Sequence, residues 1–262
     1  IMGEGEFLKE IFAMKERHLK ILNIINEKEK VSVQELSETL KLSMVTIRKD
    51  LEDLESQGLL RRLHGFAVKA SPDSINSRMA FHYPEKKAIA QKAVELVQPM
   101  ETIMIESGST CALFALEAAR QKDVTIITNS AYIARYLNQT PTAHVILLGG
   151  DYDTVAEVTT GPVTQLCARE YHVNKLFVGV DGYTEESGFT NSNHTRSCVV
   201  KELATRAEHV VVLTTSDKFG RQSVAKMFTP EEVQTVVTDS NLSEEYKRLL
   251  ESHGIQVEIT EA

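Results

Sequence analysis

The segment 106–110 (ESGST) has the residue types of an anion-binding loop. It lies between an apolar run and a predicted helix that begins near Cys111. Backbone amides and hydroxyl groups in such a loop bind phosphate, and the helix dipole assists them. The same residues also make a good helix cap, so the sequence alone leaves both roles open.

Four further apolar runs end in polar or glycine-rich segments, with the sequences TNS, GG, GVDG and SDKFG. The side chains of Asn129, Asp181 and Asp217 can hold sugar hydroxyls. Lys201 and Lys218 are either phosphate partners or solvated surface charges. Together these positions predict a site for a phosphorylated small molecule, made of Glu106, Ser107, Gly108, Ser109, Thr110, Thr128, Asn129, Ser130, Gly149, Gly150, Asp181, Gly182, Lys201, Asp217 and Lys218.

The same side chains raise the question of catalysis. Glu106, Asp181, Asp217 and Lys218 suffice in principle for acid–base chemistry on a sugar phosphate, but the catalytic motifs of such an isomerase are not recognisable. No two of the eight histidines have metal-ligand spacing, and the three cysteines form no C-x-x-C pair. We therefore predict no enzyme, no metal and no cofactor. His194 is as compatible with an ordinary loop residue as with a site residue.

The elements that position these residues follow Pro84, where short apolar runs alternate with helical stretches. The runs are rich in valine and isoleucine, as in strands covered on both faces of a parallel sheet. Ligands bind such sheets at the carboxyl ends of the strands. The sequence predicts an α/β fold with a mostly parallel sheet, and its strands are 102–106, 124–128, 144–148, 176–180, 210–215, 235–238 and 256–259.

The N-terminal part has a different pattern, that of a helix-turn-helix. An apolar stripe predicts a helix over about 14–26. Ser32 and Glu35 form a capping box for a short second helix. Ser43 caps a third helix that ends near Gly58, a residue suited to the left-handed position after a helix.

A hairpin with its turn at His64–Gly65 fits the segment 59–69 and completes a winged module. The first two turns of the third helix are the part that a recognition helix inserts into the major groove. The basic hairpin would lie beside the DNA backbone. The predicted DNA-binding residues are Ser43, Met44, Thr46, Arg48, Lys49, Arg61, Arg62, His64 and Gly65. A three-helix unit that contacts protein is the alternative.

The charge distribution is compatible with DNA binding by this module alone. The chain has a net charge of −8. Residues 14–70 hold 11 Lys/Arg and 9 Asp/Glu, whereas residues 71–262 hold 17 and 25. Within the third helix the acidic residues come late, from Asp50 onward, where they need not meet phosphate. The acidity of the chain therefore belongs to the C-terminal part.

These residues resemble the DeoR family of bacterial repressors. The match is specific in the run that begins at Thr46 (TIRKDL) and in Arg62-x-His64-Gly65, although the family usually has a second glycine where this chain has Phe66. The later motifs SGST, TNS, LLGG, FVGVDG, ESGFT and SDKFG occur in the family's order. The resemblance implies a C-terminal domain that has the fold of ribose-5-phosphate isomerase and binds phosphorylated sugars or related metabolites. The family more often has aspartate at Glu106, and the longer side chain would reach further into the pocket.

We predict a tail over 1–13 (an extension or an added segment), a winged helix-turn-helix over 14–70, a linker over 71–83 and an effector-sensing α/β domain over 84–262. The predicted function is a ligand-controlled transcriptional regulator, usually a repressor, that binds double-stranded operator DNA as a homodimer or homotetramer. The sequence has no secretory signal and no membrane-spanning run, which favours a cytoplasmic protein without membrane contact. The alternatives are a sugar-phosphate isomerase with a DNA-binding appendage and a protein-interaction scaffold.

Overall fold

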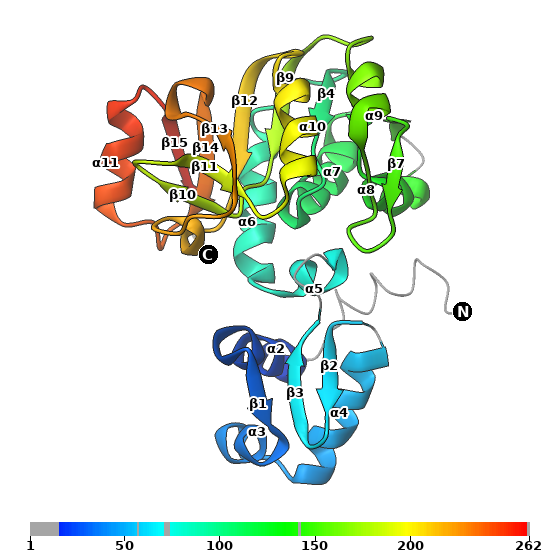
Figure 1. The fold of residues 1–262 in the computed structure, drawn as a ribbon, viewed down its shortest axis with the longest axis vertical. Coiled ribbons are helices and arrows are strands. Elements are labelled where there is room, and N and C mark those ends of the chain that lie inside the picture. The colour runs from blue at the N-terminus through cyan, green and yellow to red at the C-terminus, as the bar shows by residue number, and fades with distance from the viewer. Residues whose placement is uncertain (1–15, 57, 71–73, 141–142, 261–262) are drawn as a thin grey trace. The chain divides into compact units, whose positions relative to one another are not determined.

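A computed structural model describes residues 16–56, 58–70, 74–140 and 143–260. The chain divides into two compact units, Ile1–Tyr83 and Pro84–Ala262 (Figure 1). Within the described residues, none of the helices has both the length and the apolar character needed to cross a bilayer.

The N-terminal unit packs three helices against a small antiparallel sheet. Ser32 Oγ accepts a hydrogen bond from Glu35 N at 3.0 Å and caps the second helix. Ser43 Oγ caps the third in the same way, and Gly58 ends it with a φ of +70°. The two predicted serine caps are thus confirmed, whereas the Glu35 side chain pairs with Lys28 and does not complete the capping box. The elements are α2 (Glu16–Lys28), β1 (Lys30–Ser32), α3 (Val33–Leu40), α4 (Met44–Ser56), β2 (Leu60–Leu63) and β3 (Phe66–Lys69), with the sheet order β1-β3-β2.

The hairpin turn between β2 and β3 explains how the chain tolerates Phe66. His64 and Gly65 have φ values of 39° and 83°. Two-residue hairpin turns of this kind need positive φ at both central positions, which glycine adopts without strain. Phe66 follows as the first residue of β3 and pairs with Leu63. Because its φ is not positive, the turn does not require a second glycine there.

The segment 71–83, expected to be an irregular linker, is helical over α5 (Ile75–Ala80). Ser74 caps this helix, and Ile75 and Met79 are buried on one face of it. Phe81 belongs to the same apolar cluster as the helices of the N-terminal unit. The prediction was wrong here because the polar residues between the apolar positions obscured their helical spacing. Residues 71–73 lie outside the described residues.

The C-terminal unit is built on a parallel sheet of seven strands in the order β15-β14-β12-β9-β4-β5-β6. All seven predicted strands are confirmed: β4 (Thr102–Ile105), β5 (Thr125–Thr128), β6 (His144–Leu147), β9 (Val173–Val178), β12 (Ala207–Leu213), β14 (Thr235–Asp239) and β15 (Gln256–Thr260). The central strands are buried on both faces. The helices are α6 (Tyr83–Val94), α7 (Ser109–Gln121), α8 (Ala131–Tyr136), α9 (Gly161–Ala168), α10 (His194–Ala204) and α11 (Glu244–Ser252).

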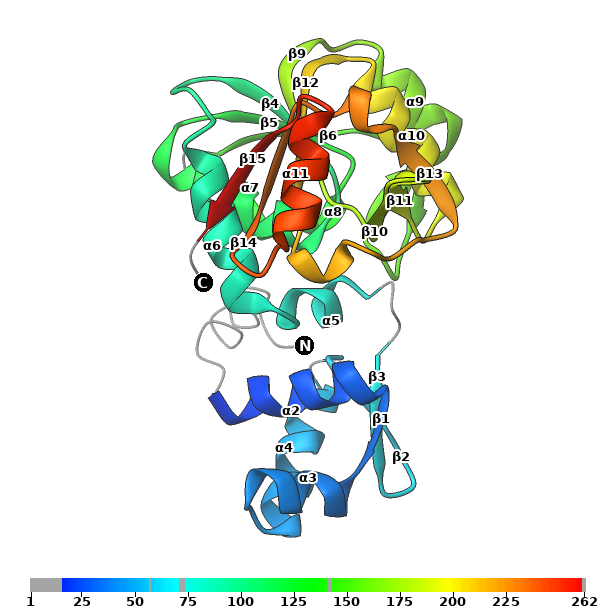
Figure 2. The same cartoon turned by 90° about the vertical axis from the view of Figure 1, so that its left-hand side faces the viewer.

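The strand order reverses between β4 and β9. From β4 the chain proceeds outward through β5 and β6, and from β9 it proceeds in the other direction through β12, β14 and β15. Because crossover connections are right-handed, helices on the two branches cover opposite faces of the sheet, and Figure 2 shows α7 and α10 on opposite sides. Such a reversal opens a crevice at the carboxyl ends of the two strands, where open α/β sheets bind ligands.

Two small antiparallel sheets extend the loops of this unit. One is the hairpin of β7 (Asp151–Asp153) and β8 (Val158–Thr160), which follows β6. The other has the order β10-β11-β13, from β10 (Gly182–Thr184), β11 (Gly188–Asn191) and β13 (Ala225–Phe228). Neither was predicted, because strands of three or four residues give little periodic signal.

Candidate DNA interface and effector site

The first two turns of α4 expose a continuous face. Ile47 and Leu51 are buried in the core of the unit. The outer face and the residue before it present Ser43, Met44, Val45, Arg48 and Lys49. Val45 was not in the predicted set, because an apolar residue in a helix is expected to be buried, yet it is 74% exposed. An exposed apolar group on a recognition helix suits the methyl group of thymine.

The basic residues of this unit have different partners. Within the described residues, Arg48 and Lys49 form no ion pair and are exposed. Arg62 is held by Glu55, whose carboxylate accepts hydrogen bonds from Arg62 N at 2.6 Å and from Arg62 Nε at 2.7 Å. These bonds hold the pKa of Glu55 below its ordinary value. Arg62, which was predicted to contact DNA, forms an ion pair in the structure that joins the hairpin to α4.

The other predicted hairpin residues remain on the surface. Arg61, His64 and Gly65 are exposed. Thr46 is half-buried, and its Oγ1 lies 2.8 Å from Ser43 Oγ. The predicted DNA-binding residues therefore all lie in the N-terminal unit, and most of them are exposed. Arg62 is the one among them whose charge is compensated by a carboxylate.

A buried ion-pair cluster joins α4 to α2. Asp50 is 2% exposed, and its Oδ1 lies 2.6 Å from Arg17 Nη2 and 3.1 Å from His18 Nε2. Burial alone would raise the pKa of Asp50, but the bonds from Arg17 and His18 outweigh it and lower the pKa. His18, Asp50 and Asp53 have the side-chain types of a metal site, but the guanidinium of Arg17 already supplies the positive charge. Asp50 faces inward and does not lie on the solvent-exposed side of the helix.

In the C-terminal unit, the loop after β4 leads into the start of α7 beside the loop after β9. Gly108 is the residue before the helix, and no side chain caps α7. A Cβ added at Gly108 would lie 3.4 Å from the Cα of Gly179, so the loops after β4 and β9 approach closely. Ser109 and Thr110 form the first turn and are buried. The N-cap residue Gly108 thus offers no side-chain acceptor to the first turn of α7, and the N-terminus of a helix is a place where anions bind.

Glu106 does not extend into the crevice as expected from its length. It is 3% exposed, and its two oxygens accept hydrogen bonds from Ser107 Oγ at 2.6 Å and from Gly179 N at 3.3 Å. The longer side chain therefore spans the gap between β4 and β9. Its role is to fasten the two loops to each other.

In the segment after β5, Thr128 and Ser130 make hydrogen bonds within the protein, whereas one oxygen of Asn129 makes none among the described residues. Thr128 Oγ1 accepts a hydrogen bond from Ser130 N, and Ser130 Oγ caps α8 by accepting one from Ile133 N. Asn129 is 1% exposed and donates from Nδ2 to Thr159 O at 3.1 Å. Its Oδ1 has no hydrogen-bond partner among the described residues. A buried acceptor without a donor is costly, so Asn129 Oδ1 is suited to a ligand hydroxyl.

Two glycines of the predicted site are required by close packing. A Cβ added at Gly150 would lie 1.9 Å from Thr164 Oγ1, and one at Gly182 would lie 2.4 Å from Arg221 O. At Gly149 the nearest atom would be Cys167 Sγ at 3.9 Å. Gly149 and Gly150 thus bring α9 close to the end of β6.

The segment after β9 leads to α10, whose residue Arg196 was not among the predicted site residues. Asp181 Oδ2 accepts hydrogen bonds from Ser192 N at 2.8 Å and Ser192 Oγ at 2.7 Å. Arg196, in the first turn of α10, donates from Nη2 to Ser192 Oγ at 3.3 Å and is 2% exposed. An arginine this buried is unusual. The only sequence signal for it was an arginine close behind the strand-end motifs.

The segment after β12 is internally paired. Lys218 Nζ lies 2.8 Å from Asp217 Oδ2, and Thr215 Oγ1 donates to Asp217 Oδ1 at 2.5 Å. Asp239, at the end of β14, is 1% exposed and accepts hydrogen bonds from Ser216 N and Oγ, both at 2.8 Å. Asp217 and Lys218 thus compensate each other, and Asp239, which was not predicted, orders the loop.

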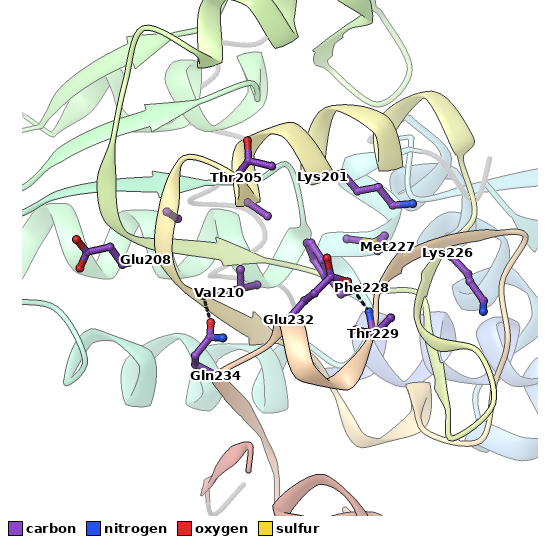
Figure 3. Close-up of a pocket in the computed structure, with 12 residues that line it drawn as sticks. Lys201, Thr205, Glu208, Val210, Lys226, Met227, Phe228, Thr229, Glu232 and Gln234 are labelled. Atoms are coloured by element: carbon purple, nitrogen blue, oxygen red, sulfur yellow. Dashed lines mark hydrogen bonds between the residues drawn. The ribbon is translucent and has the colours of Figure 1, made fainter. Parts of the chain in front are cut away.

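Lys201 is separated from the other predicted residues. It lies near the end of α10 and lines a cavity of about 460 Å³ that Figure 3 shows. This cavity also includes Ala207 and Val210 from the first half of β12 and Gln234 just before β14. It therefore lies at the amino ends of the strands, whereas the loops described above follow the carboxyl ends. Lys201 therefore lies apart from the other predicted residues, because its position on the helix cannot be judged from chain order alone.

Residues 17–73 match the family described as the DeoR-like helix-turn-helix domain, and residues 81–240 match the DeoR C terminal sensor domain. The chain belongs to the DeoR family. This DeoR-family chain is 31% identical to the HTH-type transcriptional regulator GolR of Listeria innocua over 94% of its own length and 98% of that protein's. It is 29% identical to the lactose phosphotransferase system repressor of Streptococcus mutans, over 89% and 95% of the two chains. It is accordingly a DNA-binding transcriptional regulator and not an enzyme.

Among solved structures, ribose 5-phosphate isomerase A from Methanocaldococcus jannaschii is similar with a TM-score of 0.38 and 24% sequence identity. The likeness covers 51% of this DeoR-family chain and 53% of that protein.

We expect Arg48→Ala to weaken operator binding by about 1–3 kcal/mol, the value of a bidentate contact to guanine. The measurement is fluorescence anisotropy with an operator selected from random duplexes by the wild-type DeoR-family chain. Matched duplexes with single base changes show whether discrimination is lost at one position. Unchanged affinity and unchanged discrimination between bases would show that Arg48 does not contact a base.

Lys49→Ala and Arg62→Ala should differ in their salt dependence. A lysine that neutralises one phosphate releases about one counterion. Its loss therefore makes the negative slope of log affinity against log salt less steep by about 1. Arg62 is engaged by Glu55, so Arg62→Ala should leave the slope unchanged. Titrations at several salt concentrations measure both. An equal fall in slope for the two variants would show that Arg62 contacts phosphate.

Asp50→Asn should lower the free energy of unfolding of the N-terminal unit by about 2 kcal/mol at neutral pH, because it weakens charged hydrogen bonds. The folded pKa of Asp50 is depressed, so its contribution is present above the unfolded pKa of about 3.9 and is lost as pH falls through the folded value. Chemical denaturation followed by circular dichroism should therefore show a constant difference from pH 7 to about 5 that shrinks below about 4. Glu52→Gln, at an exposed position on the same helix, is the matched control. A difference that grows on acidification contradicts the assignment.

Proposed function

We propose that this chain is a repressor that releases its operator when a phosphorylated sugar binds in the crevice between the loops after β4 and β9. The observation that carries the proposal is the start of α7, where no side chain caps the helix. A helix cap was the alternative role for the ESGST segment, and Gly108 has no side chain with which to perform it. Phosphate is a ligand that suits the amides and the dipole of a helix N-terminus.

The surrounding residues supply what a sugar phosphate needs besides these amides. Arg196 is the buried cation near the end of β9, and a charged hydrogen bond from it would be strong in a site shielded from water. Asn129 Oδ1 is a buried acceptor that has no donor in the part of the chain that the structure describes, and Asp181 carries a carboxylate. Acceptors of this kind suit sugar hydroxyls. The proposal therefore replaces Lys201 and Lys218 by Arg196 as the principal positive charge.

The names of the relatives support a sugar-related effector and repression. Besides the lactose phosphotransferase system repressor, they include a putative aga operon transcriptional repressor of Escherichia coli, 28% identical over 95% of this chain. An L-fucose operon activator of Haemophilus influenzae is also similar, at 28% over 90% of this chain. Repression is proposed here because the repressors are the more numerous of these named examples.

Binding can control DNA affinity only if the effector prefers one state of the protein. The crevice is formed by two loops that approach at Gly108 and Gly179 and are fastened by Glu106. An anion on the amides of α7 would act on both loops at once. The proposed consequence is a change in how two DNA-binding units are presented to the two half-sites of an operator.

Ser109→Asp should abolish the response to the effector while leaving operator binding intact, because its carboxylate repels phosphate from the amides of α7. The measurement is a thermal-shift screen of hexose and pentose phosphates, the corresponding free sugars and inorganic phosphate. A ligand at about 100 times its dissociation constant stabilises the native state by about 2.7 kcal/mol. We expect this shift for at least one sugar phosphate with the wild type and none with the variant.

Thr205→Asp is the matched control, because Thr205 lines the cavity at the amino ends of the strands. The same substitution there should leave the response unchanged. Loss of the response in Thr205→Asp and retention in Ser109→Asp would place the effector in that cavity. A response to free sugars equal to that for their phosphates would overturn the phosphate assignment.

A further inference from the structure

Exposed apolar side chains are concentrated at one end of the large sheet. Among the described residues, eleven large apolar side chains are exposed, and five of them fall within the 20 positions 147–166. Their exposed fractions range from 45% to 55%. We call these five the apolar patch, and they are Leu147, Tyr152, Val155, Val163 and Leu166.

The elements that carry the apolar patch lie together. The helix α9 packs on β7 and β8, and Figure 1 shows α9 beside β7. A Cβ added at Gly149 would lie 3.9 Å from Cys167 Sγ, which brings the end of β6 to the same helix. On α9, Thr164 and Ala168 face inward, so Val163 and Leu166 face outward. The patch therefore joins an edge strand, a hairpin and a helix.

The two edges of the sheet differ in a way that matters for association. β15, at one edge, carries Glu258, whose carboxylate lies 3.6 Å from Lys92 Nζ. Charged residues of this kind protect an edge from pairing with another strand. β6, at the other edge, has the sequence HVIL without acidic or basic residues other than His144. No strand of the described residues pairs with its outer side.

The charges around the apolar patch favour a protein partner over DNA or an anionic membrane. Residues 143–168 contain no lysine or arginine. Asp151 and Asp153 are acidic, and Glu157 is paired with Arg135 at 2.8 Å. Arg135 and Arg169, the basic residues that border this stretch, are paired with Glu157 and Glu202, so they are already compensated and do not favour DNA or an anionic membrane. The patch suits a protein surface of similar apolar character.

We propose that the apolar patch and the outer edge of β6 form the interface with a second copy of this chain. A two-fold axis brings the same patch of each copy together, so an apolar surface is automatically complementary. The same axis sets β6 antiparallel to its counterpart, which lets two unprotected edges pair. The occupant is a second copy because, under the proposed function, two DNA-binding units must be held for two half-sites.

The size of the surface is compatible with this occupant. The five half-exposed side chains offer on the order of 500 Å², within the range at which an exposed patch marks an interaction site. A stable dimer buries about 800 Å² on each partner. The backbone edge of β6 and the polar surface around the patch supply the remainder.

The test is the mass of the full chain in solution, measured by light scattering during gel filtration over a range of concentrations. Wild-type protein should be a dimer or a tetramer. The double variant Val163→Glu/Leu166→Glu should have half that mass, or dissociate at least tenfold more readily, because it buries four carboxylates at the axis. Val224→Glu, at a side chain that is 88% exposed and outside the patch, should behave as wild type.

A second variant, Tyr152→Glu on β7, keeps the proposal falsifiable if the double variant misfolds, as judged by circular dichroism. Unchanged mass in a folded patch variant, or a monomeric wild type at all concentrations, overturns the interface. The thermal-shift response of the same proteins to sugar phosphates is measured separately. If a monomeric variant still shows the thermal shift with sugar phosphates, the interface and the effector site are each supported independently. If the wild type shows no such shift, only the effector site is overturned.

Discussion

Parallel strands joined by crossover helices must end at the same edge of their sheet, and the sensing unit depends on that constraint. It places the carboxyl ends of the strands and the N-termini of the following helices side by side. The order of the strands reverses between β4 and β9, and open α/β sheets bind ligands at the carboxyl ends of the strands beside such a reversal. The uncapped start of α7 lies at that point. The fold and the proposed anion site therefore follow from one topology.

In the N-terminal unit, the placement of charge depends on which cations are already compensated. Arg17 and Arg62 are chemically equivalent to Arg48, but each is held by a carboxylate of α4. Asp50 and Glu55 thereby connect α4 to α2 and to the hairpin. The acidic residues of the recognition helix are thus used to fix its position. Arg48 and Lys49, without such partners among the described residues, are left for phosphate or bases.

Features set by neighbouring residues could be predicted from the sequence. The caps at Ser32 and Ser43 and the turn at His64–Gly65 depend on spacings of one to three residues, and the strands follow from continuous apolar runs. Features that depend on distant partners could not. Glu106 turns to Gly179, and Arg62 turns to Glu55, in both cases because a partner brought close by the fold competes for the side chain.

Lys201 and Arg196 show, within a single helix, that chain order does not predict which residue lies near the strand ends. Both residues belong to α10, and chain order gave no reason to prefer one. The crossover places the start of the helix near the carboxyl ends of the strands and its end near their amino ends, so Arg196 lies close to Asp181 through Ser192 while Lys201 lines another cavity. A signal that was available was that phosphate sites favour the first turn of a helix.

The two proposals share one structural element, the β7–β8 hairpin. Asn129, whose free Oδ1 is assigned to the effector, donates from Nδ2 to Thr159 O in β8. Thr159 in turn donates to Asn129 O and, from its hydroxyl, to Leu148 O at the end of β6. The other strand of the hairpin carries Tyr152 of the apolar patch. A ligand that engages Asn129 therefore acts on the same hairpin that would contact the second copy. This connection gives the effector a physical route to the spacing of two DNA-binding units, provided that the two arrangements of the hairpin differ in their affinity for it.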